Sequence, residues 1–180
     1  RYRRAALESL LEWLPREKLH TMPRTLNPQG LRALARLAFT ENYLRFVARL
    51  RRELETATHP ESITRASDHS GLPLRNVRPR VVVLANAAGA TSGLLTDIGF
   101  AARKVLSQLK SPTDVLALLY IGAPADPTTP AEECANLYAT LTEINHYADE
   151  ATSFSARYGG PEGPLLESKS RPYSAVYLVQ

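Results

Sequence analysis

The hydrophobic positions of the chain form three short continuous runs, with helix-like spacing before and between them. The runs are residues 81–85, 115–121 and 175–179, and none of them contains a charged residue. Short runs that are apolar on both faces are typical of strands buried between helices. We therefore predict three β-strands at these positions.

Four stretches have the three- and four-residue spacing of a helix that buries one side. They are residues 4–14, 28 to about 58, 92–109 and a stretch that starts at Thr129. The predicted buried residues are Leu95, Ile98, Ala102, Val105 and Leu109 in the third helix, and Leu137, Leu141, Ile144 and Ala148 in the fourth. Asn27 and Pro28 suit the start of the second helix as N-cap and first-turn proline. Thr129 with Glu132 forms a capping box for the fourth.

Two further stretches lack periodicity and are rich in turn residues. Residues 59–79 hold three prolines and are predicted to be irregular, and residues 159–164 are predicted to form a loop. From residue 81 onward the order is strand, helix, strand, helix, strand. This order predicts an α/β fold with a Rossmann-like, mainly parallel sheet and flanking helices.

Composition places the chain among globular proteins with one core, since 44% of its residues are hydrophobic and 22% are charged. No apolar run reaches the roughly 18 residues of a membrane span, and no stretch resembles a signal peptide, so we expect a cytoplasmic protein. The single cysteine, Cys134, excludes an intramolecular disulfide framework and a cysteine-built zinc site. His59 and His69 have no second close ligand in the sequence, so no metal site is predicted.

Charge is distributed unevenly along the chain. Residues 1–110 carry 19 Lys+Arg against 9 Asp+Glu, whereas residues 111–180 carry 3 against 9. Such polarity fits a nucleic-acid surface, an anionic ligand, head-to-tail contacts between copies, or solvated faces that segregate by chance. Arg45, Arg49 and Arg52 fall on the outer side of the predicted long helix, where an arginine row is usually a solvated face. Nucleic-acid binding is therefore a less favoured alternative.

The residues AGATSG, 88–93, connect the first predicted strand to the next helix. A small-residue turn in this position lets backbone N–H groups point into one concavity at the positive end of the helix, which suits a phosphate. Gly89 and Gly93 allow close approach, and Thr91 or Ser92 can cap the helix or donate to a phosphate oxygen. The same residues would also make a tight connection without a ligand, since neither common phosphate-loop motif is present.

A nucleophilic role for Ser92 is a second alternative. Asp126 and His146 follow Ser92 in the chain order of an α/β-hydrolase triad. The nucleophile elbow of that fold requires glycine two residues before and two residues after the serine. Ala90 and Leu94 occupy these positions here, which disfavours a serine hydrolase.

The ordered set of motifs resembles the tubulin/FtsZ superfamily, and within it the bacterial tubulin-like proteins. The superfamily's phosphate loop, GGTGSG, aligns with residues 88–93 and matches at Gly89, Ser92 and Gly93. Further matches on both sides are Arg36, Ala38 and Asn42; Asp97; Asn136, Tyr138, Ala139, Leu141 and Glu143; and Pro172, Tyr173, Tyr177 and Leu178. We accordingly divide the chain into an N-terminal helix and connection, 1–27, and an incomplete nucleotide-binding domain of the tubulin/FtsZ GTPase type, 28–180.

The resemblance implies that GTP, with or without Mg²⁺, binds to residues 89–93. It implies a phosphate contact for the backbone N–H groups of Gly89, Ala90, Thr91, Ser92 and Gly93, and it places Glu132 and Asn136 in the region that holds the ribose in relatives. It further implies a cytoskeletal GTPase that assembles head to tail and completes hydrolysis across a subunit contact. Residues 1–180 alone should then not hydrolyse GTP, and the first strand and the guanine contact should lie outside them.

Ala90 and Thr91 depart from the family pattern. If the position of Thr91 requires a positive φ, its β-branched side chain would strain the loop by about 1 kcal/mol or more. The alternative hypothesis is therefore a tubulin-like scaffold whose altered loop no longer binds nucleotide and which acts through partner proteins.

Overall fold

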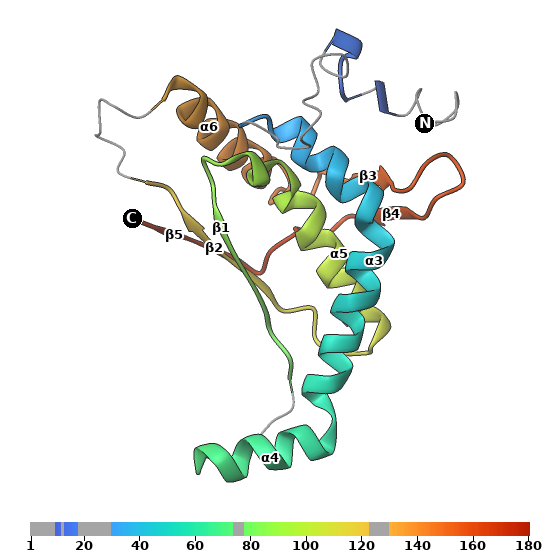
Figure 1. Cartoon of the computed structure of the whole chain (residues 1–180), viewed down its shortest axis with the longest axis vertical. Helices are drawn as coiled ribbons and strands as arrows, with labels where there is room; N and C mark the ends of the chain where they lie inside the picture. Colours follow the sequence, from blue (N-terminus) through green and yellow to red (C-terminus); the bar gives the residue numbers. More distant parts are fainter. Residues whose placement is uncertain (1–9, 12, 18–29, 74–77, 123–129) are drawn as a thin grey trace.

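The computed structural model describes residues 10–11, 13–17, 30–73, 78–122 and 130–180. Helices lie against one side of a small sheet, and a separate hairpin packs beside the longest helix (Figure 1). The elements are α3 (Arg32–Thr58), α4 (Pro60–Ser70), β1 (Val81–Asn86), the 3₁₀ helix η1 (Ala90–Leu94), α5 (Leu95–Gln108), β2 (Val115–Tyr120), α6 (Ala131–His146), β3 (Phe154–Arg157), β4 (Leu165–Ser168) and β5 (Ala175–Val179).

The main sheet has the strand order β1-β2-β5, and both of its strand pairs are parallel. The last residues of the strands are in register, since Asn86 pairs with Tyr120 and Tyr120 pairs with Val179. All three carboxyl ends therefore lie at one edge of the sheet, which is where open α/β sheets bind ligands. The predicted α/β fold with a parallel sheet and flanking helices is confirmed.

The core lies between the sheet and the helices. Each strand contributes to this core one residue of a register line that runs across the sheet. These residues are Val83, Ala117 and Val176. On α5, the predicted stripe is confirmed, because Leu95, Ala102 and Val105 are buried and Ile98 and Leu109 are half-buried. Apolar residues three and four positions apart thus place α5 flat against the strands.

The opposite face of the sheet is uncovered within the described residues. Its exposed side chains include Leu84 on β1 and Tyr177 on β5, which are 75% and 53% exposed. The prediction that helices bury the strands on both faces is therefore wrong for the part of the chain that the structure describes. An all-apolar run shows that both faces of a strand are hydrophobic, but it does not show which segment of the chain covers each face.

A second cluster joins α3 and α5 to the β3–β4 hairpin. Tyr158, which follows β3, stacks on Tyr43 of α3 with ring centroids 3.9 Å apart. Phe154 stacks on Phe100 of α5 at 4.2 Å. The predicted loop at residues 159–164 is confirmed, whereas its flanking strands were not predicted, because each has only four residues.

Two helices depart from the predicted bounds. The long helix ends at Thr58 as predicted but begins at Arg32, and Asn27 and Pro28 lie outside the described residues. Residues 60–70 form α4 instead of an irregular segment. Pro60 suits the first turn of α4, and Gly71, at φ 67°, ends it in the left-handed region. No residue of α4 is buried, so local capping signals rather than core packing account for this helix.

The helix α6 also differs from its prediction. Its N-cap is Pro130, and Thr129 lies outside the described residues. Its buried residues are Thr140 and Ile144, while Ala148 is exposed beyond the end of the helix. The hydrophobic spacing did not reveal Thr140, because this polar side chain is buried through hydrogen bonds rather than through apolar contacts.

Only part of the predicted first helix, 4–14, is described, since residues 1–9 and 12 lie outside the described part of the chain. Leu10 and Leu14 are buried and pack against Leu37 of α3. This small cluster attaches the described N-terminal residues to the first half of α3.

Candidate functional site

The loop after β1 is fixed to the carboxyl edge of the sheet. The N–H of Ala87 donates to the carbonyl of Tyr120 at 2.9 Å, which continues the β1–β2 ladder by one residue. The side-chain Oδ1 of Asn86 accepts from the N–H of Ala88 at 2.8 Å, and the Asn86 carbonyl accepts from Gly89 at 3.4 Å. The chain therefore turns tightly from β1 into η1.

Backbone donors are free at the start of η1. The N–H of Ser92 donates to the carbonyl of Gly89 at 3.0 Å. Within the described residues, by contrast, no acceptor pairs with the N–H groups of Ala90 and Thr91. Such first-turn N–H groups carry the positive end of the helix dipole, and α5 continues directly from η1. The loop can thus offer two adjacent donors to an anion.

The backbone at Thr91 is not in the left-handed region. Among the described non-glycine residues, Lys110 alone has a positive φ, at 54°. The strain considered for a positive φ at Thr91 is therefore absent. Gly89 is also in an ordinary extended conformation, with φ −79° and ψ 164°. Both altered family positions fit a 3₁₀ turn without a backbone penalty.

Gly93 is required because the chain packs closely against Arg32 at this position, and not because its backbone has a positive φ. A Cβ atom added there would lie 2.8 Å from the backbone carbon of Arg32 and would collide with the Arg32 carbonyl oxygen. At Gly89, an added Cβ would meet the Asn86 carbonyl oxygen at 3.7 Å, an ordinary contact. Gly93 therefore lets the end of the loop pack against the first turn of α3.

The side chain of Ser92 is 1% exposed and is held inside the protein. Its Oγ accepts from the Nε of Arg32 at 3.0 Å. The other two guanidinium nitrogens of Arg32 donate to the Glu143 carboxylate at 3.0 and 2.6 Å. Ser92 is thus bonded to an arginine and not to His146, while Asp126 lies outside the described residues, so the geometry gives no support to a hydrolase triad.

Glu132 and Asn136 lie on the first turns of α6 and contact the turn before α3. Asn136 Nδ2 donates to the Gly30 carbonyl at 2.9 Å. The Glu132 carboxylate packs so closely on Gly30 that an added Cβ would lie 2.5 Å from Glu132 Cδ. One turn later, Thr140 donates to the Ala87 carbonyl at 2.9 Å. Glu132 and Asn136 on α6 are therefore connected to Gly30 before α3. Through Thr140, the same helix is connected to Ala87 at the start of the loop that contains residues 89–93.

A second polar cluster lies beside the first and contains two residues of the family motifs. Arg36 pairs with both carboxylate oxygens of Asp97, at 3.0 and 3.3 Å, and Tyr158 donates to Asp97 Oδ1 at 2.6 Å. Burial lowers the pKa of Arg36, but the charge and hydrogen bonds of Asp97, together with smaller contributions from Tyr158 and Glu143, raise it, so the pKa lies above its ordinary value. Burial, and then the charge of Asp97, raise the pKa of Tyr158. This cluster therefore joins a partly exposed arginine, a buried carboxylate and a protonated phenol.

Other motif residues stabilise the same region. The hydroxyl of Tyr173 donates to the Leu95 carbonyl at 2.5 Å. Its neighbour Pro172 packs on Gly99 of α5, where an added Cβ would lie 2.8 Å from Pro172 Cβ. Sequence reasoning found Asp97, Glu143 and Tyr173 only as family matches, and it missed Arg32 and Tyr158. For Arg32, the sequence offered one signal: it lies four residues before Arg36, a family match, and this spacing places both side chains on the same side of α3.

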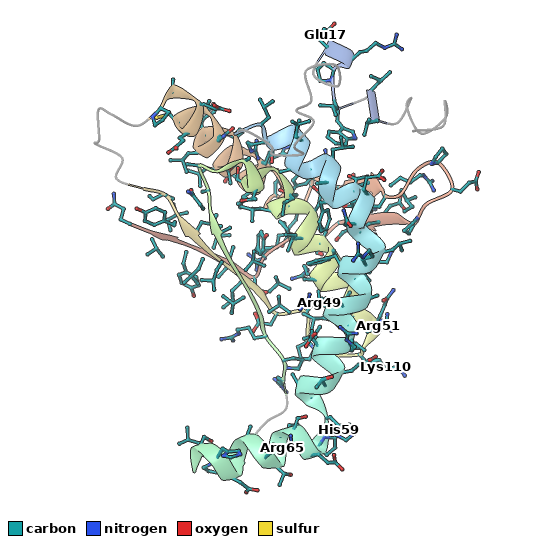
Figure 2. The ribbon with its side chains drawn as sticks, viewed as in Figure 1. Glu17, Arg49, Arg51, His59, Arg65 and Lys110 are labelled. Carbon is teal, nitrogen blue, oxygen red and sulfur yellow. The ribbon has the colours of Figure 1, made fainter. Side chains whose placement is uncertain are left out.

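The arginine row lies on the solvent side of α3, as predicted. Arg45, Arg49 and Arg52 are all exposed, and Arg49 and Arg52 lie 3.8 and 3.7 Å from Glu53. Figure 2 labels Arg49 on the lower half of α3, with Lys110 and the start of α4 at the same end of the molecule. This surface lies far along α3 from the loop, so it does not contribute to the candidate anion site.

The described residues hold neither a cluster of metal-binding side chains nor a membrane-spanning helix. They contain no group of three or more His, Cys, Asp or Glu side chains that could hold a metal ion. Among the same residues, no helix has the length and hydropathy needed to cross a membrane.

Comparison with known families agrees with the motifs. A family model described as tubulin like matches residues 1–180. The chain belongs to the tubulin-like family. Searches of the curated proteins and of the solved structures found no match to this tubulin-like chain. The tubulin-like part of the resemblance is thus confirmed.

Proposed function

We propose that this tubulin-like chain is the guanine-nucleotide-binding segment of a bacterial cytoplasmic protein. The observation that carries the proposal is the pair of N–H groups of Ala90 and Thr91, which pair with no acceptor among the described residues. They lie where the carboxyl ends of three parallel strands meet. Ligands of open α/β sheets bind at this edge, and free N–H groups at a helix start suit phosphate oxygens.

Within residues 89–93, the phosphate contact falls to the backbone N–H groups of Ala90 and Thr91 and to the hydroxyl of Thr91, which is an exposed residue. Ser92 contributes from behind the loop, since its own hydroxyl is bonded to Arg32. The exposed carboxylate of Glu132 is available to a ribose hydroxyl, and Asn136 supports the adjacent turn at Gly30. A Mg²⁺ ion that accompanies the nucleotide would take its ligands mainly from phosphate oxygens and water.

Assembly and hydrolysis form the second part of the proposal. The basic first 110 residues and the acidic last 70 suit head-to-tail contacts between copies. Hydrolysis is completed across such a contact, so the assembled full-length protein is a polymer-forming GTPase of the cytoskeleton. Residues 1–180 alone do not turn over GTP.

The test is calorimetric titration of the full-length protein with GTP, GDP and ATP in the presence of Mg²⁺. We expect saturable binding with a preference for the guanine nucleotides. A protein that shows no saturable binding at millimolar nucleotide would overturn the proposal.

A proline substitution tests the role of the free backbone donors. Ala90 is the first residue of η1, and the extended Gly89 before it suits a following proline. Ala90→Pro should therefore keep the fold, remove one donor and weaken GTP binding about tenfold, the value of one hydrogen bond to a charged group. Ala131→Pro at the first position of α6 is the matched control, and it should leave the affinity unchanged. Equal GTP affinity in Ala90→Pro and the unmodified protein would exclude this donor.

The second candidate function is a tubulin-like scaffold without nucleotide. The enclosed hydroxyl of Ser92 favours it, because the loop then offers phosphate one hydroxyl fewer than a loop with an accessible serine. This scaffold would act through protein partners, and its full-length form would bind no nucleotide in the same titration.

A further inference from the structure

Arg32 lies where three elements of the candidate site meet. It is the first residue of α3, and its guanidinium bonds to Ser92 in η1 and to Glu143 in α6. Its side chain is 14% exposed, compared with 45% for Glu143. One side chain therefore joins the start of α3, the loop and α6.

The backbone of Arg32 holds the same part of the loop. Gly93 packs against the Arg32 carbonyl group and Cβ, with no room for a side chain. Ser92 and Gly93 are thus fixed by the side chain and the backbone of one residue. Both directly follow Ala90 and Thr91, so any movement at Arg32 would be transmitted to the free N–H groups.

We propose that Arg32 is a positioning residue that sets the loop for phosphate binding and is itself oriented by Glu143. This inference rests on the nucleotide-binding function proposed above. The guanidinium is a rigid planar fork, so the two bonds to Glu143 fix its plane and direct its Nε toward Ser92. A lysine ammonium at position 32 could keep the charge but could not reproduce this set of directed bonds.

Direct binding of phosphate by Arg32 is disfavoured by the same contacts. Three of its five N–H groups, one on each nitrogen, already donate within the protein. The low exposure of the side chain leaves little of it within reach of a ligand. Arg32 therefore acts through Ser92 and the loop backbone.

The first test measures GTP affinity in the full-length protein. Arg32→Lys should weaken GTP binding at least tenfold, because the charge remains while the orientation of the loop is lost. The matched control is Arg80→Lys. Arg80 Nε donates to Asp114 at 2.6 Å before the amino end of β1, away from the loop, so this variant should bind as the unmodified protein does. Arg32→Lys binding GTP as tightly as Arg80→Lys would overturn the proposal.

The second test asks whether Arg32 acts through Ser92. In a double-mutant cycle, residues that act as one unit give non-additive effects. Arg32→Lys combined with Ser92→Ala should therefore bind GTP no more weakly than Arg32→Lys alone. Effects that simply multiply would show that Arg32 acts by another route.

A third measurement separates this inference from the proposed function. Hydrogen exchange of the amides of residues 90–94 is followed in the nucleotide-free protein. Exchange should be faster in Arg32→Lys, intermediate in Glu143→Gln and unchanged in Arg80→Lys. If the unmodified protein binds no nucleotide, the proposed function fails, but the exchange of the loop still decides whether Arg32 positions it. Unchanged loop exchange in Arg32→Lys would overturn the inference.

Discussion

Arg32 and Arg36 lie one helical turn apart on α3, and each joins this helix to an acidic residue of another helix. Their partners differ in exposure, since the Glu143 side chain is 45% exposed and the Asp97 side chain is 3% exposed. Arg36 also belongs to a cluster with Tyr158, whereas Arg32 bonds to the loop. Two similar ion pairs thus serve different purposes, because Arg36–Asp97 anchors the core and Arg32–Glu143 orients a surface loop.

The largest effect that separates the two pairs is on stability. Asp97→Ala should lower the free energy of unfolding by about 3–5 kcal/mol, because it removes a buried carboxylate and leaves both of its donors, Arg36 and Tyr158, without this partner. Glu143→Ala should cost about 1 kcal/mol or less, since its carboxylate is partly exposed to water. Urea unfolding of the two variants measures the difference. Equal losses of stability would show that exposure does not distinguish these pairs.

The two loop glycines, Gly89 and Gly93, test whether the backbone of Arg32 holds the loop as its side chain does. Gly93→Ala should lower the free energy of unfolding by about 3 kcal/mol, at the upper end for overpacking, because the new methyl group meets Arg32 backbone atoms. Gly89→Ala should change it by less than about 0.5 kcal/mol, as an unstrained surface substitution does. Thermal unfolding of both variants is the measurement. A Gly89→Ala protein as unstable as Gly93→Ala would contradict the packing seen at Arg32.

A smaller loss than those of Asp97→Ala and Gly93→Ala is expected for the phenol in the Arg36 cluster. Tyr158→Phe should lower the free energy of unfolding at neutral pH by about 1.5 kcal/mol, the value of a hydrogen bond to a charged acceptor. The denaturant midpoint of the variant, set beside that of the unmodified protein, gives this value. Among the described residues, neither Arg32 nor Glu143 forms a hydrogen bond with Tyr158, so GTP binding should be unaffected.

The same phenol gives the stability a pH dependence. The pKa of Tyr158 is raised in the folded protein by burial and by Asp97, so the folded state holds the proton more tightly than the unfolded state. Its contribution is therefore complete below pH of about 10 and is lost as the pH rises toward the folded-state value. The unmodified protein should lose more stability between pH 9 and 11 than Tyr158→Phe does, on a roughly two-unit interval around the ordinary tyrosine pKa. Parallel curves for the two proteins would contradict this account.

The sequence predicted those parts of the fold that depend on local pattern. The β5 bounds, the buried stripe of α5 and the end of α3 at Thr58 all follow from hydrophobic spacing. The missed elements lack this signal. α4 buries no residue, and β3 and β4 have four residues each, so their formation depends on caps or on contacts with distant aromatic rings.

In the candidate site, too, the sequence predicted the part that depends on local pattern and not the part that depends on long-range contacts. Small residues between a strand and a helix were sufficient to locate the loop at residues 88–93. The bonds of Arg32 span 60 and 111 positions of sequence, and no local pattern encodes such pairs. The family matches supplied Asp97 and Glu143 without a role, and only the folded chain shows that each of them holds an arginine of α3.

Trp13 is the single tryptophan of the sequence, and the Arg36 guanidinium lies 4.9 Å from the centre of its ring. The sequence therefore contains one indole fluorophore, which can be excited without its tyrosines, and it lies directly against Arg36 of the Arg36–Asp97 pair. Its emission wavelength and its quenching by small solutes will report whether Trp13 remains docked on α3. Tryptophan fluorescence can thus follow the first half of α3, near Arg36, without any added label, while hydrogen exchange follows the loop.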